Sequence, residues 1–501
     1  MKHICERNAD CPLPPYELLK YESVPQSVRD AAQEEMQETQ ATIIDVFKSF
    51  RIDLEPECIT RGPSITRYEF SAPRGLCMRR ILKHDRDLMA RTCSASVNIL
   101  APIPGKSTVG VELENSAKEP VHLRELLESA EFHNPALRIP VALGKNVYGA
   151  PVIGDLAAMP HVIVAGSTDS GKSVCINSML LSMLYKFTPE ELQLILVDPR
   201  QEEMAPYQKL PHLAMPVLSE PQHVIGALRW AVNEMERRYT YIAKAGVRNL
   251  ADFNKRDLSA PLPQGDADEQ SQPDGAANSA MPDKLPYIVI VINELADITA
   301  QVKEDLEVYI SRLVAKARGA GIHMIVATET PRANVVTGII KVNFPCRIAL
   351  KVTCATESRV ILDDRGAEKL MGSGDLFFLP PGGLLKMERA QGAFVSEAEV
   401  QSIVNFCAAH AKQSFVQSAV AEMNAEETTA TGCCAVDEEL YTRCMQLVIT
   451  GRKASAILLQ RRFSIGYGKA ARIMEMLEAR GVIAPATGSC RPREVLIAPQ
   501  E

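Results

Sequence analysis

The sequence has no apolar run that approaches the roughly 18 residues of a membrane-spanning helix. Its amino-terminal stretch, MKHICERNADCPLPPYE, also lacks the apolar segment of a secretory signal. The 13 cysteines are odd in number, scattered and without paired CxxC motifs. Cysteines in that pattern are typical of reduced thiols in a cytosolic protein, so we predict a cytoplasmic location.

An excess of basic residues is absent too, because 55 Lys and Arg face 62 Asp and Glu, for a formal net charge of −7. This balance excludes a protein whose whole surface coats nucleic acid, but it is compatible with one basic patch. Apolar residues make up 46% and charged residues 23% of the chain, which excludes a wholly disordered or fibrous protein. A length of 501 residues without internal repeats predicts about two to four globular domains.

The amino-terminal part of the chain predicts an arm and a small domain. Residues 1–25 are polar and rich in proline, as in a flexible arm. Residues 26–130 combine a helical pattern at 32–50 with short strand-like runs, such as 65–70 and 109–113, that Pro and Gly clusters separate. We therefore predict an N-terminal α+β domain.

Residues 131–411 show a different pattern, in which apolar strands alternate with helices. Continuous apolar strands bounded by helices indicate a parallel sheet covered on both faces, so the predicted fold class is α/β. Within this region, residues 259–284 are polar and aperiodic and predict a flexible loop. Residues 412–436 predict a linker, and 437–501 a small compact domain. The expected strands are residues 161–165, 192–197, 287–292, 323–327 and 346–350.

A phosphate-binding loop is the strongest functional signal. Its residues fit the pattern G-x-x-x-x-G-K-[ST] and lie between an apolar strand and an apolar helix, which is the context that this motif requires. Backbone N–H groups of such a loop point at phosphate oxygens, Lys172 supplies charge to the β- and γ-phosphates, and the Ser173 hydroxyl reaches Mg²⁺. We therefore predict that ATP and Mg²⁺ bind here. The predicted nucleotide-binding residues are Gly166, Ser167, Thr168, Asp169, Ser170, Gly171, Lys172 and Ser173.

Polar side chains at the ends of neighbouring strands predict the catalytic groups. One strand ends in Asn293 and Glu294. The first of these positions is usually Asp, which holds hydrated Mg²⁺; Asn keeps an oxygen acceptor but loses the charge. Glu294 is suited to position or deprotonate the attacking water, and Glu329, which ends the next strand, to sense the γ-phosphate. Ordinary solvation of strand ends is the alternative, and Asp198 lies near the site in either case. The predicted catalytic residues are Lys172, Glu294 and Glu329, and the predicted metal ligands are Ser173 and Asn293.

The carboxyl-terminal domain predicts a contact with double-stranded DNA. Two helical patterns joined by a turn at 463–466 suit a helix-turn-helix, and the runs 482–483 and 494–497 suit the strands of a wing. Basic residues are concentrated here in a chain that is otherwise acidic, as expected for a DNA-binding face. A winged helix that binds protein is the alternative. The predicted DNA-binding residues are Arg452, Lys453, Arg461, Arg462, Lys469 and Arg472.

Together these features resemble the FtsK/SpoIIIE family of double-stranded DNA translocases over residues 16–497. The strings that carry the resemblance include the phosphate loop, ALRWAVNEMERRY at 227–239, AKARGAGIH at 315–323 and GAEKLMGSGD at 366–375. The resemblance implies an α domain, a RecA-like P-loop ATPase β domain, and a winged-helix γ domain that reads oriented DNA sequences.

The resemblance also implies an assembly and a cellular role. A homo-hexameric ring would thread duplex DNA, hydrolyse ATP at subunit interfaces, and act in chromosome segregation and cell division with cell-division or recombination partners. The chain corresponds to the motor portion without the family's membrane-spanning region, and we expect a cytoplasmic protein that is recruited to the division septum. A neighbour's arginine would complete each site, and the candidates are Arg312, Arg318, Arg347 and Arg359.

Three motifs at the nucleotide depart from the family pattern. The family's Asp-Glu pair is Asn293-Glu294, its A-T-Q-R-P string reads A-T-E-T-P at 327–331, with Glu329 in place of Gln and Thr330 in place of Arg, and Asp169 replaces a glycine. Removing a transition-state contact commonly costs about 10²–10³ in rate. The alternative function is therefore a degenerate, hydrolysis-poor paralogue that binds nucleotide and DNA without being a motor. A coupling ATPase of the conjugation type is a third interpretation, and the C-terminal winged helix argues against it.

Overall fold

The computed structural model divides into two compact units, Met1–Asn424 and Ala425–Glu501. Apart from 281–284, the predicted flexible loop at 259–284 lies outside the described residues. The structure describes residues 12–22, 26–73, 75–94, 96–103, 105–257, 281–382, 387–424, 438–451, 454–463, 473–474, 476–478, 480, 482–484 and 495–496.

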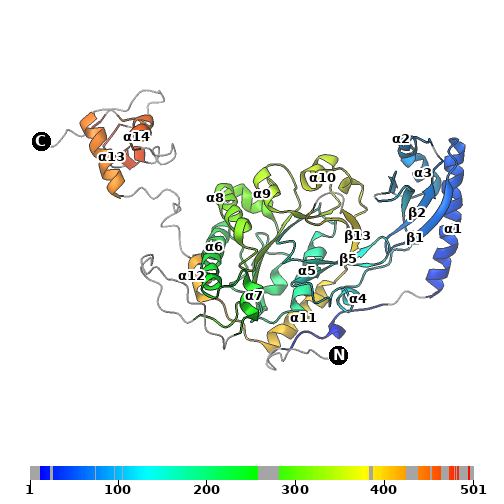
Figure 1. The fold of residues 1–501 in the computed structure, drawn as a ribbon, viewed down its shortest axis with the longest axis horizontal. Helices are drawn as coiled ribbons and strands as arrows, with labels where there is room; N and C mark the ends of the chain where they lie inside the picture. Colours follow the sequence, from blue (N-terminus) through cyan, green and yellow to red (C-terminus); the bar gives the residue numbers. More distant parts are fainter. Residues whose placement is uncertain are drawn as a thin grey trace. The chain divides into compact units, whose positions relative to one another are not determined.

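A four-stranded antiparallel sheet with helices on one face forms the N-terminal domain, drawn in blue in Figure 1. The strand order is β1-β2-β4-β3. Tyr68, Phe70 and Val111 of the sheet are buried in one cluster with Ile43 and Phe47 of the long helix α1, which explains why α1 lies along the sheet. This architecture agrees with the predicted α+β pattern. The elements are α1 (Gln26–Ser49), β1 (Glu55–Arg61), β2 (Ile65–Ser71), α2 (Met78–Ile81), α3 (Asp85–Thr92), β3 (Val97–Leu100) and β4 (Val109–Glu114).

A nine-stranded sheet forms the centre of the second domain, in the order β6-β5-β13-β12-β11-β7-β10-β9-β8. The five strands from β11 to β8 are parallel, as predicted. The remaining four extend the sheet in antiparallel fashion, which was not predicted because runs such as ERAQG in β13 are not continuously apolar. The strands are β5 (Pro140–Asn146), β6 (Pro151–Asp155), β7 (His161–Ala165), β8 (Leu192–Val197), β9 (Tyr287–Ile292), β10 (Ile322–Thr328), β11 (Cys346–Leu350), β12 (Asp375–Leu379) and β13 (Glu388–Gly392).

Helices cover both faces of this sheet, and the alternation of side chains along each strand explains how. Val162 and Val164 of β7 belong to a core with α5 and α11, whereas Ile163 and Ala165 belong to a core with α6 and α8. The parallel strands are therefore buried on both sides, and their carboxyl ends share one edge. The helices are α4 (Leu123–Leu127), α5 (Lys172–Leu184), α6 (Pro221–Lys244), α7 (Leu250–Lys255), α8 (Leu295–Lys316), α9 (Gly338–Asn343), α10 (Ala355–Leu362), α11 (Glu397–His410) and α12 (Gln417–Asn424).

Two segments that were predicted to be loose pack on this domain instead. In the described part of the arm, Leu19 is buried in the main core, and Tyr16 stacks on Tyr185 with 5.3 Å between ring centroids. In the first part of the predicted linker, α12 packs on α6, where Nε1 of Trp230 donates to Oγ of Ser418 at 3.1 Å. Each segment has too few apolar residues for periodicity to reveal its contacts in the sequence.

The second unit has a small core of its own. It contains α13 (Glu438–Gly451) and α14 (Ala456–Phe463), whose Cys444 and Leu459 are buried together with Leu477. Ile483 and Val495 form an antiparallel bridge at the position predicted for the wing. Residues 464–466 of the predicted turn lie outside the described residues.

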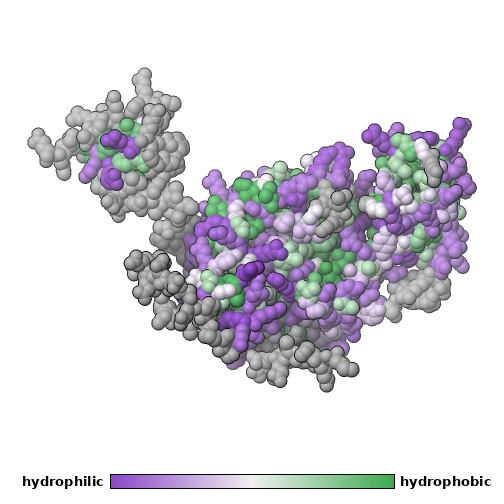
Figure 2. Space-filling model, viewed as in Figure 1, coloured by the Kyte–Doolittle hydropathy of each residue, from purple (hydrophilic) through white to green (hydrophobic). Residues whose placement is uncertain are grey.

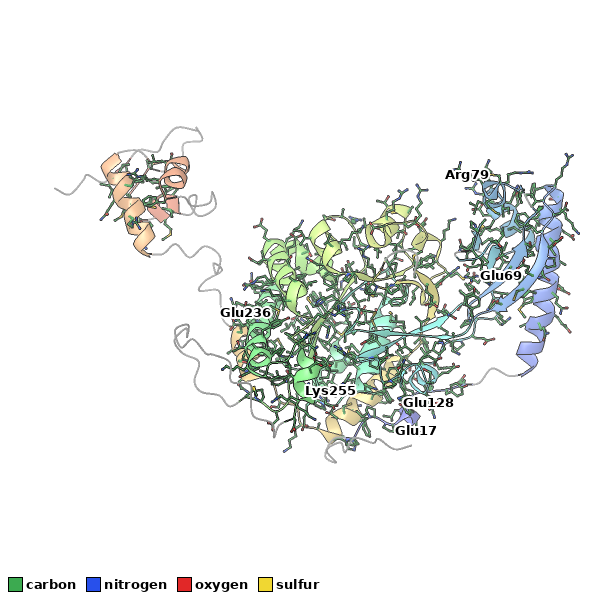
Figure 3. All side chains as sticks on the ribbon, viewed as in Figure 1. Glu17, Glu69, Arg79, Glu128, Glu236 and Lys255 are labelled. Atoms are coloured by element: carbon green, nitrogen blue, oxygen red, sulfur yellow. The ribbon has the colours of Figure 1, made fainter. Side chains whose placement is uncertain are left out.

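Side chains at the surface are distributed unevenly. Figure 2 shows mostly hydrophilic residues on the outer side of the N-terminal domain, whereas hydrophobic residues gather over α8 and α9, where Val342 is 82% exposed. Glu236 lies on the outer side of α6 (Figure 3) and pairs with Arg312 of α8 at 3.3 Å. No helix in the described part of the chain has both the length and the apolar character needed to cross a membrane. No disulfide joins any two of the eight described cysteines.

Candidate functional site

The loop between β7 and α5 has a conformation that depends on its glycines. Gly171 has a φ of +99°, and a Cβ there would lie 2.6 Å from the backbone N of Gly374. A Cβ at Gly166 would lie 2.5 Å from Oγ of Ser170, so either substitution would force the loop to move. Asp169 also has a positive φ, +61°, which Asp tolerates better than most residues, and its side chain is exposed. A positive φ is the conformation that favours glycine, which is the residue that the resemblance leads us to expect at this position.

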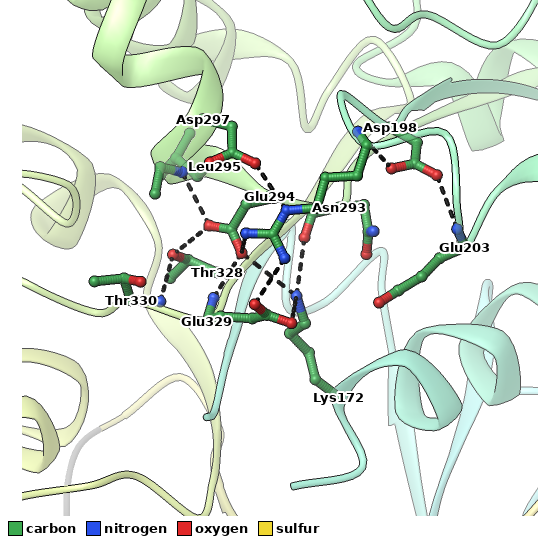
Figure 4. A network of polar contacts seen from close by, with 12 residues as sticks. Lys172, Asp198, Glu203, Asn293, Glu294, Leu295, Asp297, Thr328, Glu329 and Thr330 are labelled. Carbon is green, nitrogen blue, oxygen red and sulfur yellow. Dashed lines mark hydrogen bonds and ion pairs between the residues drawn. The ribbon is translucent and has the colours of Figure 1, made fainter. Parts of the chain in front are cut away.

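Lys172 is the first residue of α5, and its buried ammonium group faces three oxygen atoms (Figure 4). Nζ lies 3.5 Å from Oε2 of Glu294 and 3.6 Å from Oε1 of Glu329, and it donates to the backbone oxygen of Asn293 at 3.3 Å. The oxygens come from the ends of β9 and β10, and β10 lies between β7 and β9 in the sheet. The structure thus brings the three residues predicted to be catalytic together.

The carboxylate of Glu294 is held in one orientation by three donors. It caps α8 by accepting from the backbone N–H of Ala296 at 3.0 Å. It also accepts from Oγ1 of Thr328 and from the backbone N–H of Glu329, each at 2.8 Å. A buried carboxylate with these fixed donors presents Oε2 toward Lys172, as a group that must orient one water or one proton requires.

Arg200 is a functional candidate that the sequence analysis did not assign. Its guanidinium donates to Asp297 at 2.9 Å and to Oε2 of Glu329 at 2.8 Å. Burial tends to raise the pKa of Glu329, but the hydrogen bond from Arg200 and the charges of Lys172 and Arg200 outweigh it and lower that pKa. Glu329 is therefore an anion at neutral pH. The signal in the sequence that could have identified Arg200 was its position two residues after Asp198, at the carboxyl end of a parallel strand.

The turn after β8 brings a second unassigned side chain, Glu203, to the phosphate loop. Asp198 is fully buried and accepts from the backbone N–H groups of Glu203 at 3.0 Å and Met204 at 2.9 Å. These bonds fold the turn back on itself. As a result, Oγ of Ser173 donates to Oε1 of Glu203 at 2.5 Å. Asp198 thus acts on the site through the turn that it holds.

The residues present are suited to Mg²⁺ that arrives with a nucleotide. Asn293 is 2% exposed, and its Oδ1 has no hydrogen-bond partner among the described residues. Hydroxyl, amide and carboxylate oxygens, as on Ser173, Asn293 and Glu203, are the donors that Mg²⁺ prefers. Within the described ranges, no group of three or more His, Cys, Asp or Glu could hold a metal ion by itself. Such a site would rely on phosphate oxygens for most of its ligands.

A cavity of about 750 Å³ lies beside the phosphate loop. Its lining includes residues 118–121, which follow the N-terminal domain, residues 371–374, and Phe394, whose ring is 51% exposed. This volume is in the range of small-molecule and cofactor sites, with the loop on one wall and an aromatic ring available to a base.

The structure distinguishes among the arginines predicted to act on a neighbouring subunit. Arg347 donates to Asp363 at 2.7 Å and is only 13% exposed, so it is committed to its own subunit. Arg312 is 51% exposed and pairs with a surface glutamate. Arg318 and Arg359 are exposed.

The predicted DNA-binding residues are described only in part. Arg462 lies on α14 with an exposed side chain, and Arg461 lies on the same helix. Arg452, Lys453, Lys469 and Arg472, and the side chain of Arg461, lie outside the described residues.

Comparison with protein families divides the chain into three matched regions. The FtsK alpha domain matches residues 13–115, the FtsK/SpoIIIE family matches residues 122–334, and the Ftsk gamma domain matches residues 435–498. The central match covers β7, the phosphate loop and the ends of β9 and β10. Together with the parallel sheet, it confirms the RecA-like P-loop α/β fold that was expected for this domain.

Individual relatives are similar over most of the chain. A DNA translocase FtsK from Clostridium tetani is 42% identical over 90% of this chain and 58% of its own length. Another DNA translocase FtsK, from Rickettsia typhi, is 38% identical over 99% of this chain and 68% of its own length. Among solved structures, the conjugation coupling protein TcpA of pCW3 is 18% identical, with a TM-score of 0.48 over 72% of this chain and 96% of its own. The chain thus spans between about half and two thirds of the length of the curated relatives that it matches.

Proposed function

Because the chain belongs to the FtsK/SpoIIIE family, we propose that it is an ATP-driven translocase of double-stranded DNA. Its role would lie in chromosome segregation and cell division, with the winged-helix domain reading oriented DNA sequences. The observation that carries the proposal is the position of Lys172, which faces Glu294 and Glu329 beside a cavity large enough for a nucleotide.

Nucleotide binding exchanges the partners of Lys172. The backbone N–H groups of the phosphate loop and the N-terminus of α5 hold the phosphates. Lys172 turns from Glu329 to the γ-phosphate, and Glu329 remains paired with Arg200 at 2.8 Å. When bound, Mg²⁺ neutralises charge on the β- and γ-phosphate oxygens, and Ser173 and Asn293 are the residues predicted to face it.

Glu294 is the residue best placed to act on the attacking water. Its carboxylate is fixed by Thr328 and by two backbone N–H groups, and it lies 3.5 Å from the ammonium of Lys172. It orients the water and accepts its proton as the bond to the γ-phosphorus forms and the bond to the leaving ADP breaks. Loss of the γ-phosphate returns Lys172 to Glu329, so Glu329 reports the state of the nucleotide to Arg200.

Assembly and DNA contact complete the proposed motor. We place six copies in a ring, with an exposed arginine such as Arg318 or Arg359 of one copy reaching the nucleotide of the next. The basic side chains of the C-terminal unit, Arg462 among them, contact duplex DNA. The proposed setting is the cytoplasm, with recruitment to the division septum by cell-division or recombination partners.

The alternative, a paralogue that binds nucleotide and DNA but hydrolyses little, is not favoured. Asn293 removes one carboxylate relative to the family pattern, but Glu329 adds one within 3.6 Å of Lys172. The family pattern has Asp, Glu and Gln at three positions where this chain has Asn293, Glu294 and Glu329. Two of the three therefore carry a carboxylate in either case. The fixed carboxylate of Glu294, which both patterns share, supports a site that still activates a water molecule.

The test is ATP hydrolysis by the purified chain, measured with and without duplex DNA. We expect turnover that DNA stimulates and that Lys172→Ala reduces by at least about 10². Lys244→Ala, which changes an exposed lysine at the end of α6, is the matched control and should leave turnover unchanged. Retained nucleotide and DNA binding without turnover would instead support the hydrolysis-poor paralogue.

A further inference from the structure

Two oxygen atoms beside the phosphate loop are buried and have no hydrogen-bond partner among the described residues. They are Oδ1 of Asn293 and Oε2 of Glu203. Buried polar atoms are nearly always paired, so each of these oxygens indicates a donor or a cation that the folded chain does not supply. Figure 4 shows the two side chains on the same side of Lys172.

The other oxygen of Glu203 marks the metal position in the phosphate-loop motif. Oγ of Ser173, the hydroxyl that reaches Mg²⁺ in this motif, donates to Oε1 of Glu203 at 2.5 Å. The buried carboxylate of Asp198 holds the backbone N–H of Glu203 at 3.0 Å and thereby fixes the turn that presents this side chain. The contact between Ser173 and Glu203 therefore depends on a turn that Asp198 holds in place.

The two carboxylates that face Lys172 are already committed to other groups. Glu294 accepts from three donors and faces Lys172, and Glu329 is bound by Arg200 at 2.8 Å. In the described part of the chain, no cation pairs with Glu203. Asn293 has no charge to offer a divalent ion, although its buried amide oxygen has no hydrogen-bond partner in the described ranges.

We propose that Glu203 is the acidic partner of the Mg²⁺ that accompanies the nucleotide, in place of the Asp that the family pattern has at Asn293. Glu203 binds the hydrated ion through Oε2, and Asn293 contributes a neutral oxygen. This inference rests on the proposed function, because the ion arrives with the triphosphate. It differs from the assignment made from the sequence, in which Asn293 and Ser173 alone held the metal.

The test is the Mg²⁺ dependence of binding a fluorescent, non-hydrolysable ATP analogue. Glu203→Gln keeps the length of the side chain and an oxygen for Ser173 but removes the charge. We expect the Mg²⁺ concentration for half-maximal enhancement of binding to rise about tenfold or more, and the affinity in EDTA to stay unchanged. Glu190→Gln makes the same change of charge at an exposed position just before β8, outside the lining of the cavity, and should leave the Mg²⁺ midpoint in place.

A second variant keeps the test decisive if Glu203→Gln folds poorly. Asn293→Asp should lower the Mg²⁺ midpoint in the wild-type background and restore it in the Glu203→Gln background, since one carboxylate replaces another at the same ion. The amount of Mn²⁺ bound to the protein–analogue complex, measured by electron paramagnetic resonance, should fall in Glu203→Gln and recover in the double variant with Asn293→Asp. An unchanged midpoint in Glu203→Gln, or an equal shift in Glu190→Gln, would overturn the inference. Wild-type protein that binds no analogue in either Mg²⁺ or EDTA would instead overturn the proposed function.

Discussion

Glu329 competes with the nucleotide for Lys172. Its carboxylate lies 3.6 Å from the ammonium group, and its lowered pKa keeps it charged at neutral pH. We predict that Glu329→Gln tightens binding of a non-hydrolysable ATP analogue by roughly threefold to tenfold, because it removes a negative charge beside the γ-phosphate. Asp297→Asn is the control, because it removes a carboxylate that pairs with Arg200 and, in the described part of the chain, forms no ion pair with Lys172. Weaker binding by Glu329→Gln, measured by titration calorimetry, would contradict this role.

The residues of the site differ in whether neighbouring residues in the sequence could reveal their role. The phosphate loop could be predicted because its glycines, Lys172 and Ser173 are consecutive and their spacing is set by the backbone. Arg200 and Glu203 could not, because their contacts depend on the turn that Asp198 holds. Ser173 and Glu203 are 30 residues apart in the chain, and no periodicity joins them.

At the scale of the strands, two buried histidines make stability depend on pH. Burial lowers the pKa of His161 in β7 to about 3, with a contribution from His323, and burial lowers that of His323 in β10 to about 4. Both are neutral in the folded state and take up protons on unfolding below the usual pKa of 6.5. Their contribution is therefore intact above pH 6.5 and is lost as the pH falls toward 4, by about 1.4 kcal/mol per pH unit for each histidine.

The matching prediction concerns the slope of that loss. In His161→Leu, the free energy of unfolding should fall less steeply between pH 6.5 and 5 than in the wild type. The slope should be smaller by about 1.4 kcal/mol per pH unit, which corresponds to the uptake of one proton. Urea unfolding of the full chain, followed at several pH values, measures it. His223→Leu, at a partly exposed position on α6, should keep the wild-type slope. Identical slopes for His161→Leu and wild type would show that His161 is not neutral in the folded protein.

A buried ion network joins the N-terminal domain to the nucleotide-binding domain. Arg389 of β13 binds Asp375 of β12 at 2.7 Å and also contacts Glu112 of β4, which Arg67 of β2 binds at 2.6 Å. Burial alone would raise the pKa of Glu112, but the charges of Arg389 and Arg67 outweigh it and lower that pKa. The network lies next to Gly374, whose N–H donates to the phosphate loop at Ser170.

Removing the central arginine leaves the buried carboxylate of Asp375 without its charged partner and leaves Glu112 with Arg67 as its one remaining cation among the described residues. We predict that Arg389→Met lowers the free energy of unfolding by about 3–5 kcal/mol. Arg124→Met breaks the more exposed pair with Glu128 and should cost less than about 1 kcal/mol. Denaturant unfolding compares the two variants, and an equal cost for both would show that burial does not strengthen the Arg389 network.

Elements were predictable where burial leaves a continuous signal. The parallel strands are apolar at every position because both faces are covered, so β7, β9 and β10 could be recognised. The strands β12 and β13 could not be placed in the sheet, because one includes Asp375 and the other Arg389, which are buried as ion-pair partners. The helix α12 was missed because its contact with Trp230 is made across the fold.

At the scale of the whole molecule, the C-terminal unit should contribute affinity for DNA. Arg462 is exposed on α14, in a unit that has its own core. We predict that Arg462→Ala weakens binding to duplex DNA about equally for all sequences and reduces the salt dependence by about one counterion. Arg443→Ala, whose guanidinium lies over the ring of Phe463, is the control. A loss confined to one DNA sequence would assign Arg462 to base recognition instead.

Movement along duplex DNA is the central claim, and displacement of a third strand from a duplex measures it most directly. The purified chain, supplied with ATP and Mg²⁺, should displace a triplex-forming strand placed far from its loading site, and Lys172→Ala should not. Displacement that is equally fast without ATP, or that survives in Lys172→Ala, would contradict the account.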